Sequence, residues 1–334
     1  MLRLCLFVLP LTLMFLGGDS SFKMKASLRG VHNLKNGVIW ASGSEGAILR
    51  SVDNGSVWQP CSIPPDAEKL DFRGIRAFDK NRAVAMSSGP GAASRLYETT
   101  DGCHSWRLLF ANSDPAGFWD AIAFHGETGV LLGDPVDGRF VIYRTSDGGR
   151  RWIRDQSAAL TAHPKGEGAF AASNSALVIR PDGKKILFGT GGPGGPRIFM
   201  SDLDASGNWT VADLPWTGSN DAAGIFSLAF RDGTHGVAVG GDYKSPANRD
   251  RTAVFTSDGG ARWQAASAPP GGYRSSVDWD QRMREWIAVG PNGSDISKDD
   301  GRTWRRLDSA DGNALSLPWV VGSHGRIARL RPVF

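Results

Sequence analysis

The stretch Thr145-Ser146-Asp147-Gly148-Gly149-Arg150-Arg151-Trp152 decides the fold, because its pattern Ser/Thr-x-Asp-x-Gly-x-x-Trp recurs along the 334-residue chain. The further copies of this box run from Ser51 to Trp58, Thr99 to Trp106, Thr256 to Trp263 and Ser297 to Trp304, with a stretched copy from Ser201 to Trp209. The copy at Thr99 carries Cys103 where the others carry glycine. Successive box tryptophans are 41 to 57 residues apart, which is the period of a four-stranded propeller blade.

Each residue of the box has a local structural task. The aspartate can fold its carboxylate back onto backbone N–H groups two residues further on, and glycine supplies a positive φ. The tryptophan buries a large ring where the next strand begins. The box therefore predicts a hairpin turn followed by an aromatic anchor.

These boxes resemble the Asp-box, or BNR, repeats of sialidase-like propellers. The nearer likeness is to the photosystem II stability/assembly factor family and its bacterial relatives, in which Thr-x-Asp-Gly-Gly-x-x-Trp is the usual form. The resemblance covers roughly residues 28 to 330. It implies an all-β propeller and a chaperone-like role on an assembling complex, although a fold does not by itself define a function.

Seven blades are predicted from the repeat count: six units with a box and a last unit, from Asn313 to Leu330, that has room for about three strands. We expect residues Phe22 to Ala26 to supply its fourth strand, because this closure removes a free sheet edge. The inner strands are predicted to begin at the following segments: Leu28 to Leu34, Phe72 to Ile75, Phe118 to Ile122, Gly166 to Phe170, Gly224 to Phe226, Tyr273 to Ser275, and Ala314 to Leu315.

The N-terminus has the pattern of a secretory signal peptide. Arg3 precedes an apolar run from Leu4 to Leu16, and small polar residues follow. The run is short for a membrane span and suits a signal-peptide core. We therefore expect residues 1–20 to be a signal peptide and 22–334 to be one propeller domain, exported to the periplasm or outside the cell and not membrane-spanning.

Composition restricts the partners. The chain has 38 basic and 34 acidic residues without a basic run, so it has no signature of nucleic-acid binding.

No cofactor or metal is predicted. The segment from Gly189 to Gly194 matches G-x-G-x-x-G, but Pro193 and Pro196 forbid the helix that such a site needs. The six histidines lack zinc spacing. Cys61 and Cys103 lie in adjacent repeats and can be either free thiols or one disulfide. We expect a monomer.

The candidate site lies on the face opposite the boxes. The boxes are turns between the third and fourth strands of each blade, so the loops between the second and third strands and the starts of the inner strands share the other face, where loops on a rigid scaffold often bind ligands. Solvated loops are also polar without any ligand. The polar residues predicted to gather there are Arg73, Asp120, Asp134, Asp137, Glu167, Arg197, Asp242, Tyr243, Tyr273, Arg274 and His324.

Two functions fit these residues. The first is a binding or assembly-factor-like protein that recognises a partner protein, a small polar ligand or a glycan on this face. The alternative is a sialidase-like glycosidase, with Tyr273 and Glu167 as the nucleophile pair and Asp120 as the acid/base. The resemblance to sialidases implies an Arg-Ile-Pro motif near the start, which this chain lacks. The sequence therefore favours binding over catalysis.

Overall fold

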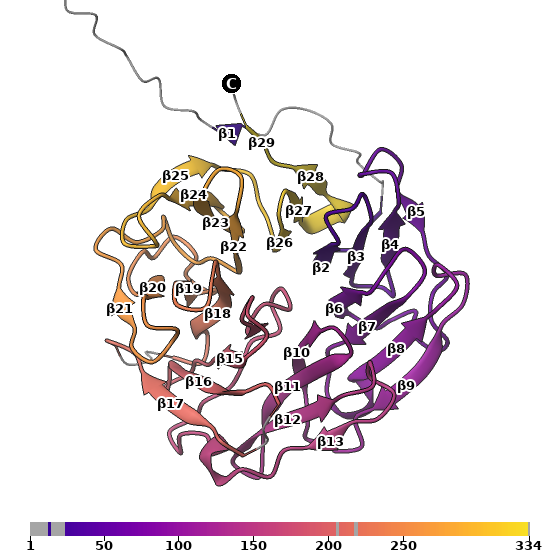
Figure 1. The fold of residues 1–334 in the computed structure, drawn as a ribbon, viewed down its shortest axis with the longest axis horizontal. Coiled ribbons are helices and arrows are strands. Elements are labelled where there is room, and N and C mark those ends of the chain that lie inside the picture. Colours follow the sequence, from indigo (N-terminus) through magenta and orange to yellow (C-terminus); the bar gives the residue numbers. More distant parts are fainter. Residues whose placement is uncertain (1–12, 15–23, 205–206, 217–219, 333–334) are drawn as a thin grey trace, which may run out of the picture.

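The computed structural model describes residues 13–14, 24–204, 207–216 and 220–332. In this part of the chain, sheets stand around a central axis like the blades of a propeller (Figure 1). Six sheets have four antiparallel strands in sequence order from the axis outward, and the last has three. Seven blades and an all-β fold were predicted, and the structure confirms both.

The strands are short and follow the chain order of the blades. The first three blades contain β2 (Leu28–Asn33), β3 (Ile39–Gly43), β4 (Ile48–Ser51), β5 (Gln59–Pro60), β6 (Phe72–Ala77), β7 (Ala83–Ser87), β8 (Arg95–Thr99), β9 (Arg107–Ala111), β10 (Trp119–His125), β11 (Thr128–Val136), β12 (Arg139–Thr145) and β13 (Ile153–Arg154). The next two contain β14 (Leu177–Ile179), β15 (Lys185–Gly189), β16 (Arg197–Asp202), β17 (Thr210–Asp213), β18 (Ala223–Phe230), β19 (Gly236–Asp242), β20 (Ala253–Thr256) and β21 (Gln264–Ala265).

The last two blades contain β22 (Ser276–Asp280), β23 (Glu285–Gly290), β24 (Gly293–Ser297), β25 (Arg305–Asp308), β26 (Ala314–Ser316), β27 (Trp319–Val321) and β28 (Ile327–Arg329). A separate two-stranded ladder joins β1 (Leu13–Met14) to β29 (Arg331–Pro332). Three short 3-10 helices lie in loops: η1 (Gly91–Ala93), η2 (Ala158–Leu160) and η3 (Ser323–Gly325).

The boxes are the turns between the two outer strands, as predicted, but their hydrogen bonds reach further than two residues. In the box of blade three, Thr145 Oγ1 donates to Asp147 Oδ1 at 2.8 Å and accepts from the N–H of Gly149 at 3.0 Å. The same carboxylate oxygen accepts from the N–H groups of Arg150 and Arg151, both at 3.0 Å. These hydrogen bonds lower the pKa of Asp147, and the bond from the N–H of Arg151 has the largest effect.

The N-terminal segment closes the ring, although it does so across a turn. Residues 24–27 form no strand; the carbonyl of Ala26 accepts from the N–H of Gly325 at 2.8 Å, and Leu28 N–H donates to the Gly322 carbonyl at 3.0 Å. Ala26 lies two residues before the start of β2, the inner strand of blade one, and its partner Gly325 places it at the turn between β27 and β28 instead of beside β28. The rest of the expected strand, Phe22 and Lys23, lies outside the described residues.

The inner strand of blade four differs from its prediction. It is β14, not the segment at Gly166–Phe170, which makes only a single bridge, from Gly168 to Gly191. Residues 171–175 instead bond to the inner strands of four other blades. Their contacts are Ala171 O with Arg73 Nη1 at 2.9 Å, Asn174 with both backbone groups of Ile122 at 2.8 and 2.9 Å, Ser175 Oγ with Ser227 Oγ at 2.7 Å, and Ser173 Oγ with the carbonyl of Ser275, just before β22, at 2.6 Å. We call this segment the central plug.

Candidate functional site

Four inner strands carry a β-bulge close to their start. The pairing registers shift between Leu28 and Gly30, Phe72 and Gly74, Trp119 and Ala121, and Ile225 and Ser227. The residues left unpaired are Arg29, Arg73, Asp120 and Phe226. A bulge re-aims a side chain, and bulges are common beside functional sites. Here the contacts described below place the four residues in one group beside the central plug.

Two arginines share one carboxylate in this group. Arg73 Nε donates to Asp71 Oδ2 at 2.8 Å, and its Nη1 donates to the Ala171 carbonyl of the central plug at 2.9 Å. Arg29 Nε lies 3.6 Å from the same Asp71 oxygen as an ion pair. Within the described part of the chain, this buried Nε makes no hydrogen bond. Burial, and then the charge of Arg73, lowers the pKa of Arg29.

Two neighbouring acidic side chains, Asp120 and Asp134, belong to the same group, and Asp120 lies within reach of the charge of Arg73. Asp120 is 1% exposed, and its Oδ2 has no hydrogen-bond partner among the described residues. Asp134 Oδ1 accepts from the N–H of Ala169 at 2.9 Å. Burial raises the pKa of Asp120 well above its usual value, and the neighbouring charge of Asp134 raises it further. Asp120 therefore holds its proton above the pH at which an exposed aspartate loses it, and becomes a hydrogen-bond donor.

The Asp120→Asn variant should lose less stability than the wild type as the pH rises. A raised folded-state pKa means that the carboxyl's contribution is fully present below the unfolded pKa near 4 and is lost as pH rises through the folded pKa. Urea unfolding from pH 4 to pH 8 should show the stability difference between Asp120→Asn and the wild type shifting in favour of the variant. Asp137→Asn, which changes an exposed turn carboxylate, is the control; parallel curves for Asp120→Asn and the wild type would contradict the protonated buried state.

Aromatic rings line the opposite side of the group. Phe226 stacks on Phe170 with ring centroids 3.8 Å apart, and it meets the edges of Tyr273 at 4.7 Å and Tyr243 at 6.2 Å. Tyr273 is buried, and burial raises its pKa, while Arg29 and Arg73 act in the opposite direction. Tyr243 is 47% exposed. The rings of Phe170, Phe226, Tyr243 and Tyr273 thus extend from the exposed Tyr243 to the buried Tyr273 near the two arginines. We call these four residues the aromatic step.

The structure removes several predicted residues from this group. Both carboxylate oxygens of Glu167 bind Arg197, and they also accept from Thr190 Oγ1 at 2.5 Å and His163 N–H at 2.9 Å. Arg274 is fully buried and pairs with Asp295 and Asn292. These ion pairs hold loops together.

Three other predicted residues lie in turns or at the end of a strand. Asp137 is exposed in the turn after β11 with a φ of 51°, and His324 is exposed within η3. Asp242 Oδ2 accepts from Asn220 Nδ2 at 3.0 Å. The site therefore keeps Arg73, Asp120, Asp134, Tyr243 and Tyr273 from the prediction.

Arg29, Asp71, Phe170 and Phe226 were missed by the sequence reasoning. A signal existed for Arg29, because Leu28-Arg29-Gly30 repeats the pattern of Phe72-Arg73-Gly74 at the same place in the preceding blade. No signal identified Phe170, which reaches the site only because the chain around it leaves the expected strand.

The geometry does not favour the glycosidase arrangement. A tyrosine nucleophile needs a base that accepts its proton, but both carboxylate oxygens of Glu167 already accept hydrogen bonds, from Arg197, Thr190 and His163. Burial also raises the pKa of Tyr273, which opposes formation of a tyrosinate. Across the described residues no group of three or more His, Cys, Asp or Glu side chains can hold a metal ion. No helix in the described part is long and apolar enough to cross a membrane.

Comparison with known proteins identifies similar folds. No family model matches the chain, and no curated protein matches it. The structure is similar to YCF48 bound to a D1 peptide, with a TM-score of 0.65, 16% identity and coverage of 96% of this chain and 99% of that chain. It is also similar to YCF48 from Cyanidioschyzon merolae, with a TM-score of 0.64, 16% identity and coverage of 94% and 98%.

An enzyme has a similar fold over part of its length. The Niastella koreensis GH74 enzyme matches with a TM-score of 0.59 and 15% identity, over 90% of this chain and 51% of that chain. At such identities these likenesses concern the fold. The chain is a seven-bladed propeller similar in architecture to YCF48 along nearly its whole length.

Proposed function

We propose that this protein is an exported, monomeric binding propeller that recognises a partner protein through the group formed by Arg29, Arg73, Asp120 and the aromatic step. The observation that carries the proposal is the pair of buried polar groups, Arg29 Nε and Asp120 Oδ2, that have no hydrogen-bond partner in the described structure. Such groups cost free energy unless something satisfies them. A ligand that enters between the arginines and the aromatic step would do so.

The chemistry of the group defines the ligand. Arginine binds carboxylates through charge-assisted hydrogen bonds, and the protonated Asp120 adds a donor beside them. The aromatic step offers ring surface for an apolar group next to that anion. We therefore propose a peptide segment of a partner that presents a carboxylate beside an apolar side chain. The complex of YCF48 with a D1 peptide supports this, because it is a propeller of the same fold with a bound peptide.

Export remains part of the proposal. We propose residues 1–20 as a signal peptide, with the mature chain in the periplasm or outside the cell. The disulfide between Cys61 and Cys103 supports this, since disulfides persist in oxidising compartments.

Selection from a displayed random peptide library, followed by binding assays of the selected peptides, tests the site. The wild type should enrich peptides that combine an acidic group with an apolar residue, and Arg29→Ala and Arg73→Ala should each weaken binding about tenfold, the loss of one or two charge-assisted hydrogen bonds. Arg262→Ala is the matched control, because this arginine lies on the box rim with its side chain 87% exposed.

Two results would contradict the proposal. Selected peptides that bind both arginine variants as tightly as the wild type would place the site elsewhere. Hydrolysis of a sialoside or another glycan by the purified protein, abolished in Tyr273→Phe or Glu167→Gln with folding intact, would establish the glycosidase instead.

A further inference from the structure

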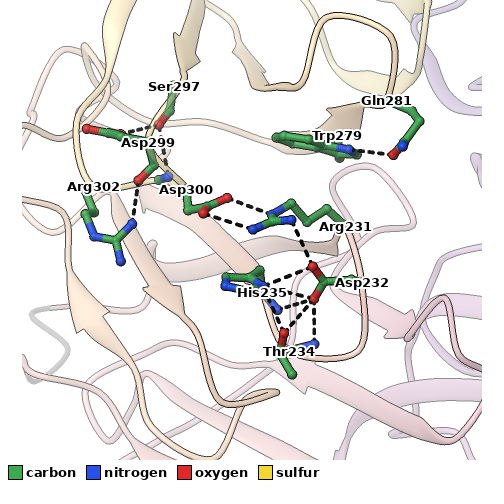
Figure 2. Close-up of polar contacts among 11 residues, drawn as sticks. Arg231, Asp232, Thr234, His235, Trp279, Gln281, Ser297, Asp299, Asp300 and Arg302 are labelled. Atoms are coloured by element: carbon green, nitrogen blue, oxygen red, sulfur yellow. Dashed lines mark hydrogen bonds and ion pairs between the residues drawn. The ribbon is translucent and has the colours of Figure 1, made fainter.

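The boxes form the opposite rim, where arginines fill the junctions between neighbouring blades. Figure 2 shows one such junction, between blades five and six: Arg231 follows β18 and reaches Asp300 in the next blade's box at 2.8 and 3.1 Å. Arg82 acts similarly between blades two and three, where it binds Glu127 at 2.7 Å and the Gly148 carbonyl at 3.2 Å. Long side chains close the gaps between these blades.

The junction between blades three and four is built differently: the arginine that crosses it is Arg144 of β12, which binds Ser201 Oγ and the carbonyls of Asp202 and Leu203 in the next box, and no arginine stands at the position of Arg231. His125 takes the position of Arg231, because Phe124 pairs with Gly129 as Phe230 pairs with Gly236. The imidazole is shorter than an arginine and lies against Gly183, where an added Cβ would meet its Nε2 at 2.7 Å. The box of blade four is also the stretched one. A groove of about 1150 Å³ remains there, which is larger than a typical small-molecule pocket.

The acidic side chains that line this groove are mostly engaged within the protein. Asp155 Oδ2 accepts from Arg144 Nε at 3.2 Å and from Trp209 Nε1 at 3.0 Å. Asp202 pairs with Lys185 Nζ at 2.7 Å, and Asp147 is bonded within its own box. Asp204 is the exposed acidic residue of the lining.

Three basic side chains of the lining are available, whereas Arg144 is engaged by Asp155 and by the box of blade four. Arg151, Arg154 and Lys184 line the groove, and none of them forms an ion pair with another described residue. Ile153 stands between the two arginines and is 60% exposed. These three cations have no ion-pair partner among the described residues, and they line the same groove as an exposed aliphatic side chain. Such a lining is complementary to a peptide segment in which acidic residues flank an apolar residue.

We propose that this groove is a second binding site, which takes an extended acidic peptide of a protein partner. The exposed Ile153 favours a peptide over an acidic glycan, because an aliphatic side chain needs an apolar partner to leave water. The two sites lie on opposite rims and share no residue. The protein would then hold two partner segments at once, one on each face.

The test uses a fluorescein-labelled Glu-Glu-Leu-Glu-Glu peptide with an acetylated N-terminus and an amidated C-terminus, measured by fluorescence anisotropy. We expect saturable binding that weakens at least tenfold in the Arg151→Glu/Arg154→Glu variant and in 0.5 M NaCl, where exposed charges are screened. Ile153→Ser should weaken it less. Arg262→Glu, a charge reversal at another box, is the control for net charge, and thermal melts confirm that each variant folds.

The proposal fails if the peptide does not saturate the wild type, if Gln-Gln-Leu-Gln-Gln binds equally well, or if the double charge reversal has no effect. It also fails if oligogalacturonate binds this groove and the peptide does not, since the site would then be one for acidic glycans. The peptide also presents carboxylates beside a leucine and so fits the site at Arg29 and Arg73; every arm is therefore repeated in the Arg29→Ala/Arg73→Ala background, in which binding that depends on Arg151 and Arg154 should persist. This background separates the groove from the site of the proposed function, so either one can fail without the other.

Discussion

Loss of the Cys61–Cys103 disulfide should lower the free energy of unfolding by about 4 kcal/mol, as chain entropy predicts for a sequence separation of 42 residues. The bond joins the chain just after β5 in blade one to the box turn of blade two. Both cysteines pack in the same apolar cluster, and Cys103 is 2% exposed. Urea unfolding of the oxidised protein, the reduced protein and Cys61→Ala measures the loss.

A matched variant separates the bond from the backbone strain at Cys103. This residue has a φ of 66° at the box position where other blades carry glycine, such as Gly149 with a φ of 91°. A left-handed conformation costs a non-glycine residue about 1–2 kcal/mol. Cys61→Ala/Cys103→Gly should therefore recover about 1 kcal/mol relative to Cys61→Ala. Unchanged unfolding on reduction would show that the two thiols are not bonded in solution.

The propeller could be predicted from the sequence because the information is local. Each box specifies its own turn within eight residues, and repetition turns a weak local pattern into a blade count. The disulfide was left open, since two cysteines in adjacent repeats do not reveal how close their turns lie.

The candidate site could be predicted only in part. Arg73 and Asp120 were found because charged residues at the start of inner strands are conspicuous. Glu167 and Arg274 look equally conspicuous in the sequence, but their partners Arg197 and Asp295 lie 30 and 21 residues away on neighbouring strands, and only the fold brings these pairs together. The bulges and the central plug depend on the register of the sheets, and no residue pattern in this chain predicts that register.

The groove at the box rim could not be predicted from the sequence either. In the sequence all boxes look like equivalent turns, and their pattern predicts no site on this rim. The structure distinguishes them by the residue at the inner hairpin of each junction. This residue is Arg231 or Arg82 at two junctions and His125 between blades three and four, where Arg144 of β12 makes the contacts to the next box. The shorter side chain of His125 leaves a groove beside Arg144 at this junction.

Trp209→Ala should cost about 3–5 kcal/mol of stability, as large core truncations do, and Trp152→Ala should cost clearly less. Trp209 is 6% exposed, packs against Phe188 with ring centroids 5.4 Å apart, and donates to Asp155 at 3.0 Å. Trp152 is only partly buried and makes no side-chain hydrogen bond within the described residues. The regular box of blade three therefore has a weaker anchor than the stretched box of blade four.

Chemical unfolding of the two variants side by side measures this difference, and equal losses would contradict the burial of the two rings. The variants also separate the two binding faces. Removal of the Trp209 ring leaves Asp155 without its indole donor and Arg144 without the ring it lies over at 5.5 Å, and both residues line the groove between blades three and four. We expect Trp209→Ala, studied at a temperature where it remains folded, to weaken binding of the acidic peptide on the box rim. Binding at Arg29 and Arg73 should persist, because the contacts of Trp209 with the described residues do not reach that face.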